Sequence, residues 1–408
     1  MKRPKAHLLV HILCLLLVLV MSVPVAASAD SDNKLRPAPP SLQHQPEPVP
    51  DLSGKETLSL EEAMALAYKY NPDLRKAELQ LDRAEILRDL AAQSVTFMPT
   101  GDLLVMPEGR SLINSYEKAD TNWKAAKKTN ESKKLRIEQE VLTAYAGALK
   151  NFNLMELARM QLQDMEEQNH VYQVATVQGV VSNLDLRSSK RGVQQLQDSL
   201  EAHQAAYELS LATLRSLLNQ GPQWKPVLTS RPILGDFSRA ELFLELSRGE
   251  NQSIMMLQAD TLLKMEESKL YWGLGSNEED PYMDKLNLYL RELDYEQAKR
   301  DTRSTVEQLY HRIDTLEKQI AIYESTLEQR EQDLQTAQLM YEVGLMSYRS
   351  LRPTEPCLAA TELAVQRTQL ELENARADLA TLRATFAYLT GQSQVYSKLD
   401  WTTTSAAG

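Results

Sequence analysis

Apolar residues recur every three to four positions through most of this chain, which is the pattern of amphipathic helices. The pattern is sustained over two very long stretches, about 111–178 and about 284–343, and the second is broken once, at Arg330. A helix rises about 1.5 Å per residue, so a stretch of roughly 65 residues would extend for about 100 Å. That length exceeds an ordinary globular helix, and we therefore expect coiled-coil packing.

Each long stretch ends at a glycine-containing turn that leads into another periodic stretch. The segments Gln178–Leu186 and Tyr341–Leu351 both contain G-x-x-S with a leucine four residues after the serine. Their glycines, Gly179 and Gly344, are 344 − 179 = 165 residues apart. Self-similarity at this spacing indicates one duplicated unit rather than a short solenoid repeat. We predict an all-α fold of two repeated coiled-coil hairpins, each folded at one of these glycines.

Short helices precede each long stretch. Ser59 with Glu62 forms a capping box for the first of them, and Asn71-Pro72 ends it and starts the next. Asn251 takes the place of this break in the second half. We expect the following divisions: a first repeat at 57–221, a proline-bearing connector at 222–239, a second repeat at 240–393 and a tail at 394–408.

The N-terminal region predicts export. Residues 1–29 have a charged start, an apolar run from Leu8 to Met21 and an A-x-A site at Ala27–Ala29, as in a signal peptide, although an uncleaved anchor is the alternative. Residues 30–56 are a proline-rich linker. Removing the signal takes away three positive charges and no acids, which changes the net charge from −11 to about −14. This acidic balance argues against a nucleic-acid partner.

No motif of catalysis or metal binding is present in the sequence. The six histidines are scattered without metal-ligand spacing, and there is no phosphate-binding loop or G-x-S-x-G motif. Without the signal, Cys357 is the single cysteine, so no internal disulfide is expected. The acidic run Glu278–Asp280 is most simply a solvated turn. We therefore expect a protein that is not an enzyme and has no cofactor or metal.

Several motifs together resemble the TolC-like outer-membrane efflux proteins. The opening Leu58–Ala67 followed by Asn71-Pro72-Asp73-Leu74 is similar to the start of that family. The two turn segments are similar to its hairpin tips, and Leu218–Gly221 and Leu389–Gly391 are similar to the closing motif of each half. The resemblance runs from about 57 to 393, in family order and in both repeats.

The resemblance implies a homotrimer whose helical hairpins form a tapered tunnel in the cell envelope. Such tunnels receive substrates from an inner-membrane transporter through a periplasmic adaptor that docks on the hairpin tips. It assigns family helix breaks to Asn71, Pro72 and Asn251. The implied tip contacts are Gly179, Ser182, Leu184 and Asp185 in the first repeat, and Gly344, Leu345 and Ser347 in the second.

Two departures from the family pattern change what we expect. Between helices the family has long membrane strands, which need about 9–11 residues each, but 94–110 and 272–283 offer only 17 and 12 residues with proline or glycine in them. We predict loops there, with β-strand segments vestigial or absent, that do not span a bilayer.

The second departure is at the tips. Ala175 and Met340 stand where adaptor-docking members usually have an arginine, and Pro353 and Pro356 should delay the last helix. A non-conducting structural coiled-coil protein of the envelope is therefore the alternative to an efflux component.

Overall fold

The computed structural model describes residues 56–95, 107–233, 240–271, 281–351, 355–392 and 401–403. Residues 1–55 lie outside this part, so the signal peptide and most of the proline-rich linker stay predictions. All described residues belong to one compact unit, Glu47–Gly408.

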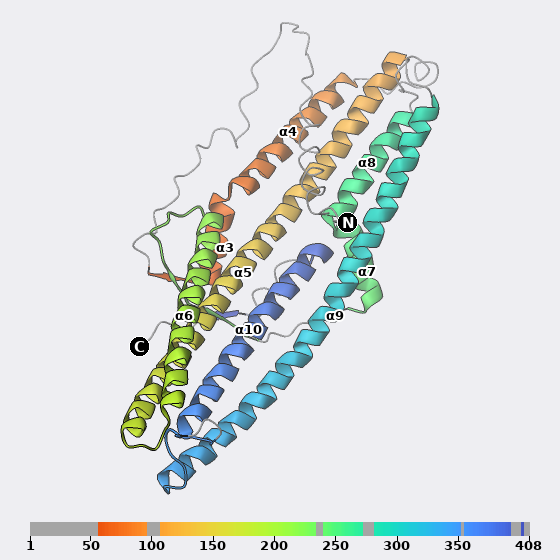
Figure 1. Cartoon of the computed structure of the whole chain (residues 1–408). Coiled ribbons are helices and arrows are strands. Elements are labelled where there is room, and N and C mark those ends of the chain that lie inside the picture. The colour runs from red at the N-terminus through yellow and green to blue at the C-terminus, as the bar shows by residue number, and fades with distance from the viewer. Residues whose placement is uncertain are drawn as a thin grey trace, which may run out of the picture. The chain divides into compact units, whose positions relative to one another are not determined.

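Two long helical hairpins dominate this unit, as the periodicity predicts (Figure 1). In the first, the 71-residue α5 (Pro107–Val177) packs against α6 (Asn183–Leu217). In the second, the 62-residue α9 (Pro281–Glu342) packs against α10 (Leu358–Thr390). The predicted all-α fold of two repeated hairpins is confirmed.

Pairs of shorter helices precede each hairpin. These are α3 (Leu60–Tyr70) and α4 (Pro72–Ser94) in the first repeat, and α7 (Leu242–Gln252) and α8 (Ile254–Tyr271) in the second. The capping box at the start of α3 is present, because Ser59 Oγ accepts from the Glu62 amide while the Glu62 carboxylate accepts from the Ser59 amide. In each repeat the second short helix packs along the long one, α4 on α5 and α8 on α9.

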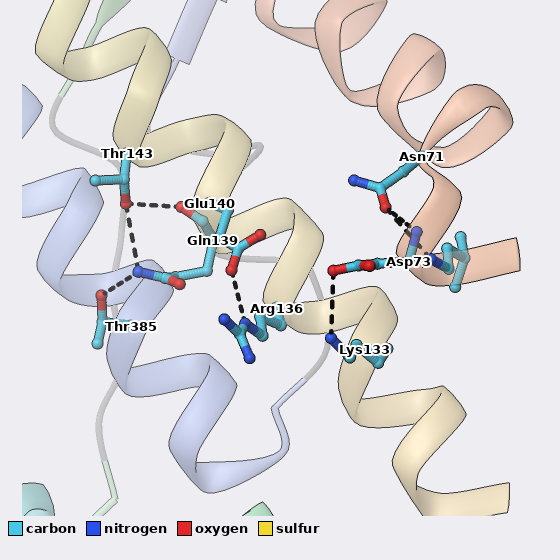
Figure 2. Close-up of polar contacts among 9 residues, drawn as sticks. Asn71, Asp73, Lys133, Arg136, Gln139, Glu140, Thr143 and Thr385 are labelled. Carbon is cyan, nitrogen blue, oxygen red and sulfur yellow. Dashed lines mark hydrogen bonds and ion pairs between the residues drawn. The ribbon is translucent and has the colours of Figure 1, made fainter. Parts of the chain in front are cut away.

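The break between α3 and α4 depends on one asparagine side chain. Asn71 ends α3 and caps α4, since its Oδ1 accepts from the amides of Asp73 and Leu74 at 2.9 and 3.3 Å, with Pro72 in the first turn. Asp73 then lies 3.7 Å from Lys133 of α5, which fixes this end of α4 against the long helix (Figure 2). The sequence therefore locates this break correctly.

The corresponding break in the second repeat does not lie at Asn251. Asn251 is inside the last turn of α7, and its side-chain Nδ2 donates to the Ser247 carbonyl at 2.7 Å. The chain breaks instead at Ser253, which ends α7 and whose carbonyl accepts from Leu257 in α8. The prediction was two residues early, because without a proline no residue in this stretch forces the helix to stop.

Both long helices begin earlier than the apolar pattern suggests. We expected starts near Ser111 and Asp284, but α5 begins at Pro107 and α9 at Pro281. Proline has no amide hydrogen to leave unbonded in a first turn, so it suits these positions. The predicted loops with vestigial strands fall mainly on 96–106 and 272–280, which lie outside the described residues. No helix in the described ranges is long and apolar enough to cross a membrane.

Helix α10 joins the two hairpins, because it packs against both α9 and α5. Its α5 side carries an ion pair between Asp378 and Lys150 at 2.7 Å. On the same side the Thr385 hydroxyl accepts from the Gln139 side-chain amide at 3.3 Å (Figure 2). Its α9 side carries the ion pairs Arg376–Glu324 and Arg383–Glu317 at 2.8 and 3.1 Å. The packing order of the long helices is therefore α6, α5, α10, α9.

Among the residues that the structure describes, four very short strands lie at the base of the hairpins, and the sequence pattern did not predict them. β1 (Thr57–Leu58) pairs in parallel with β2 (Val227–Leu228), and β3 (Ser230–Pro232) pairs antiparallel with β4 (Trp401–Thr403). Strands of two or three residues carry no readable alternation. The connector and the tail thus belong to the folded body where they form β2, β3 and β4.

Tyr145 of α5 holds these strands together. Its fully buried hydroxyl donates to the Leu58 carbonyl at 3.0 Å and accepts from the Ser230 amide at 2.9 Å. Its ring meets the Trp401 ring edge-on, with centroids 5.7 Å apart. One side chain therefore contacts β1, β3 and β4.

We predict that Tyr145→Phe destabilises the protein by about 1–3 kcal/mol, because the buried Ser230 amide loses its acceptor. The measurement is urea unfolding followed by circular dichroism. Tyr341→Phe, at a side chain 46% exposed, is the control and should change stability by less than about 0.5 kcal/mol. Equal effects of the two substitutions would contradict the role given to Tyr145.

Burial also raises the pKa of Tyr145. The folded state therefore holds the phenol proton more tightly than the unfolded chain, so the stabilisation is complete below the unfolded pKa of about 10. It should decline as the pH rises above that value, and Tyr145→Phe should flatten this alkaline decline.

Candidate functional site: the hairpin tips

Both long helices end in the same hydrogen-bonded turn. At the first tip the Val180 amide donates to the Ala175 carbonyl at 2.9 Å, and the Gly179 amide donates to Thr176 at 3.0 Å. This pair of bonds is a Schellman motif. In such a motif the residue that follows the helix, here Gly179, adopts a left-handed backbone conformation. Gly179 has φ +75°, which a residue with a side chain adopts only with strain.

The second tip repeats this geometry. The Leu345 amide donates to the Met340 carbonyl at 2.8 Å, the Gly344 amide donates to Tyr341 at 3.0 Å, and Gly344 also has φ +75°. The two glycines thus have the same structural role in both repeats. Ala175 and Met340, which stand where the resemblance led us to look for an arginine, supply the carbonyl that closes each turn.

After the glycine the first tip turns directly into a helix. Ser182 caps α6, since its Oγ accepts from the Asp185 amide at 3.2 Å and donates to the Asp185 carboxylate at 2.7 Å. Leu184, between them, is 71% exposed. This tip is short and apolar at its surface.

The second tip has a longer path to its helix. α10 begins only at Leu358, after Pro356, so the predicted delay by the prolines is confirmed. Ser347 does not cap a helix with its side chain; its carbonyl and that of Tyr348 accept from the first amides of α10, Leu358 and Ala359, at 3.3 and 3.1 Å. Residues 352–354 lie outside the described part of this connection.

Arg349 fastens the second tip to the first hairpin. Its guanidinium donates to the Asp164 carboxylate and to the Glu167 carboxylate of α5, both at 2.6 Å. The side chain is 12% exposed, and Gln168 of α5 adds a 2.7 Å bond to the Ser350 carbonyl. The sequence interpretation missed this group, although acids at spacing i, i+3 opposite a loop arginine are a signal for it.

Electrostatics agree with the geometry of this contact. Hydrogen bonds from Gln163 and Arg349 lower the pKa of Glu167. The carboxylates raise the pKa of Arg349, although burial of the guanidinium opposes the shift. The contact is therefore an ion pair at neutral pH.

The tips present apolar side chains to solvent. Val177, Val180 and Leu184 are exposed at the first tip, and Val343 and Leu345 at the second. No group of histidine, cysteine and acidic residues in the described ranges has the arrangement of a metal site. Such surfaces can bind another protein by apolar packing.

We predict that alanine at the glycines with positive φ lowers the free energy of unfolding by different amounts. Gly179→Ala and Gly344→Ala should each cost about 1–2 kcal/mol of stability from backbone strain alone, because space around both is open. Gly391→Ala should cost more, since its Cβ would lie 2.6 Å from the Gln252 Cβ. Gly221→Ala, with φ outside the left-handed region and open space, is the control. Urea unfolding of the four variants checks this order, and an unaffected Gly391→Ala would overturn it.

We also predict that Arg349→Met loosens the start of α10. The amides of Leu358 and Ala359 should exchange hydrogen at least several-fold faster, measured by exchange and mass spectrometry, because the carbonyls that hold them belong to the Arg349 loop. Arg367→Met, at an exposed arginine that pairs with Glu371 within α10, is the control and should leave the exchange rates of these two amides unchanged.

Lowering the pH should weaken the contact between Arg349 and Glu167, and so loosen the start of α10 as Arg349→Met does. The pKa of Glu167 is lowered in the folded state, so its contribution is present above the unfolded pKa and is lost as pH falls through the folded value. The difference in the exchange rates of the Leu358 and Ala359 amides between Arg349→Met and the unchanged protein should therefore become smaller at low pH. A larger difference at low pH would contradict the ion-pair assignment.

No protein-family profile and no curated relative matches the sequence. Solved structures do match the fold. The outer-membrane channel CmeC of Campylobacter jejuni is 12% identical with a TM-score of 0.57, over 83% of this chain and 88% of that one. The open state of the MtrE outer-membrane channel of Neisseria gonorrhoeae is 14% identical with a TM-score of 0.56, over 82% and 89%. The outer-membrane channel OprN is 14% identical with a TM-score of 0.55, over 90% and 99%.

Identities this low establish the fold alone. The similarity extends over 82–90% of this chain, and the three proteins are described as outer-membrane channels. The chain therefore has the fold of the TolC-like outer-membrane efflux proteins.

Proposed function

We propose that this protein is an exported subunit of an efflux conduit in the cell envelope. Three copies would form the conduit, and the hairpin tips would meet a periplasmic adaptor that connects it to an inner-membrane transporter. The proposal involves no cofactor and no nucleic acid.

The observation that carries the proposal is the open row of long helices. α5 and α10 pack on both sides, whereas α6 and α9 are the ends of the row α6, α5, α10, α9. A row of amphipathic helices can be extended at its end helices by further copies, edge to edge, into a closed ring. The tunnel of the TolC-like fold is a ring of this kind.

An exposed apolar stripe on α9 supports assembly at that edge. In its first turns, side chains at i, i+4, i+7, i+8 and i+11 are exposed: Tyr282, Leu286, Tyr289, Leu290 and Leu293. This spacing is that of a helix–helix interface. A stripe of this size is unusual on a surface that stays in water.

The bare tips support a contact with an adaptor. Val180 and Leu345 follow the turn glycines and are 62% and 80% exposed. Since neither Ala175 nor Met340 offers a charge, the contact we propose depends on apolar packing. The names of the similar structures, which describe outer-membrane channels, point in the same functional direction.

The assembly can be tested by measuring mass. The mature protein should have three times the mass of one chain by light scattering, and Leu286→Asp with Leu293→Asp should give single chains, because buried charges oppose the interface. Leu244→Asp, at an exposed leucine of α7, is the control. A single chain before any substitution would overturn the proposed assembly.

Export is tested in cells that lack the gene. Restoring the protein should restore resistance to exported toxic compounds, and Val180→Asp with Leu345→Asp should remove that resistance while keeping the trimer. Val227→Asp, an exposed valine of β2, should restore it fully. A trimer whose loss changes no export would instead support the structural coiled-coil alternative.

A further inference from the structure

The seam between α9 and α10 contains one polar layer. Seam positions recur at alternating steps of three and four: Ile313, Leu316, Ile320, Tyr323, Leu327, Arg330, Leu334 and Ala337 on α9, and Val365, Thr368, Leu372, Ala375, Leu379, Leu382, Phe386 and Leu389 on α10. Arg330 and Thr368 are the polar members of these two series. Thr368 is buried, whereas Arg330 is exposed, so its charged end can stay in water while its stem lies along the seam.

The pairing of the helices brings these two residues to neighbouring levels. The ion pairs Glu324–Arg376 and Glu317–Arg383 fix the antiparallel register, since both sums of residue numbers are 700 (324 + 376 and 317 + 383). Arg330 therefore lies opposite position 370, next to Thr368. The apolar seam is interrupted on both helices at one place.

A half-open cavity lies at this interruption. Its volume is about 340 Å³, and its lining combines Ile322, Tyr323 and Thr326 of α9 with Ala364 and Thr368 of α10, and the charged side chains of Arg330, Arg367 and Glu371. Small residues on the α10 side, Ala364 and Thr368, leave the space that a larger residue would fill. Volumes of about 300 Å³ and above are typical of small-molecule sites.

The charges in the cavity favour an anion. Arg367 Nε donates to the Glu371 carboxylate at 2.8 Å, so these two charges compensate each other. Arg330 is exposed, and within the described part of the chain no ion pair or hydrogen bond involves its side chain. One solvent-accessible guanidinium that is open to a partner thus lines an otherwise mainly apolar hollow.

We propose that this cavity binds a small anionic amphiphile. The carboxylate or sulfonate head would accept from the Arg330 guanidinium, and the hydrocarbon body would lie against Ile322, Tyr323 and Ala364. Guanidinium is suited to this role because it presents several donors in one plane to a carboxylate. The site lies along the hairpin, away from the tip residues, and does not depend on the proposed export function.

Decanoate, kept below its micelle concentration, is the probe. Calorimetry of the mature protein in buffer without other amphiphiles should show saturable binding, and Arg330→Gln should weaken it by about tenfold or more, as expected for a lost charge-assisted bond. Decanol, which lacks the charge, should bind more weakly than decanoate and equally to both proteins. Arg312→Gln, at an exposed arginine of α9 outside the cavity, should bind decanoate unchanged.

Two further measurements locate the site and protect the test from misfolding. Ala364→Leu should fill the hollow and abolish binding with Arg330 intact, and thermal unfolding should show that each variant folds. A diazirine-bearing decanoic acid should label peptides that contain 322–330 or 364–371, in competition with decanoate. Absence of binding, equal binding by Arg330→Gln, or labelling confined to other peptides would overturn the proposal.

Discussion

The structure depends on helix α10, which packs against α9 of its own hairpin and also against α5 of the first hairpin. Its α9 face is the apolar seam of the second hairpin, centred on Ile313, Ile320 and Phe386, all fully buried. Its α5 face is made of small residues, such as Ala377 and Ala380, which let the helices approach closely. Around these, Asp378 reaches Lys150 and Arg383 reaches Glu317, so ion pairs at the margins set the register on both sides. Loss of this helix would remove the main packing between the two repeats and leave the smaller contact between α5 and α8 and the short strands.

The elements that sequence reasoning located are those with long-range periodicity or an obligatory residue. Two hairpins follow from apolar spacing sustained over scores of residues, and both tips follow from glycines that have positive φ. Asn71-Pro72 marks its break because proline cannot continue the preceding helix. Asn251 failed because a break without proline is set by tertiary packing, which no local pattern reports. The strands on either side of Tyr145 failed for a related reason: their partners lie up to 173 residues apart (403 − 230), and each strand is too short to show a period.

The hairpin tips likewise combine features that local sequence predicts with a contact that only the fold creates. The left-handed glycines and the cap at Ser182 are local, and the sequence contains all the information that they require. Arg349 acts across 185 residues on Asp164, and only the fold brings them together. The contact explains why the second tip tolerates a longer connection: the arginine and the backbone of Ser347 and Tyr348 replace the direct capping that Ser182 provides in the first repeat.

The two repeats therefore share the backbone geometry of their tips, while the side-chain contacts around each tip differ. Both tips use the same pair of backbone bonds and the same φ, because a helix can reverse there only by satisfying its last carbonyls. Side chains are free of that constraint, and the two repeats use them differently: one tip is a bare apolar turn, and the other is tied to its neighbour by charge. The same freedom applies along the seam, where Arg330 replaces an apolar residue without unfolding the hairpin, since the flanking layers Leu327 and Leu334 continue the seam. A coiled coil of this length can thus accept a polar layer at one level, and that level is where a binding function can arise without cost to the fold.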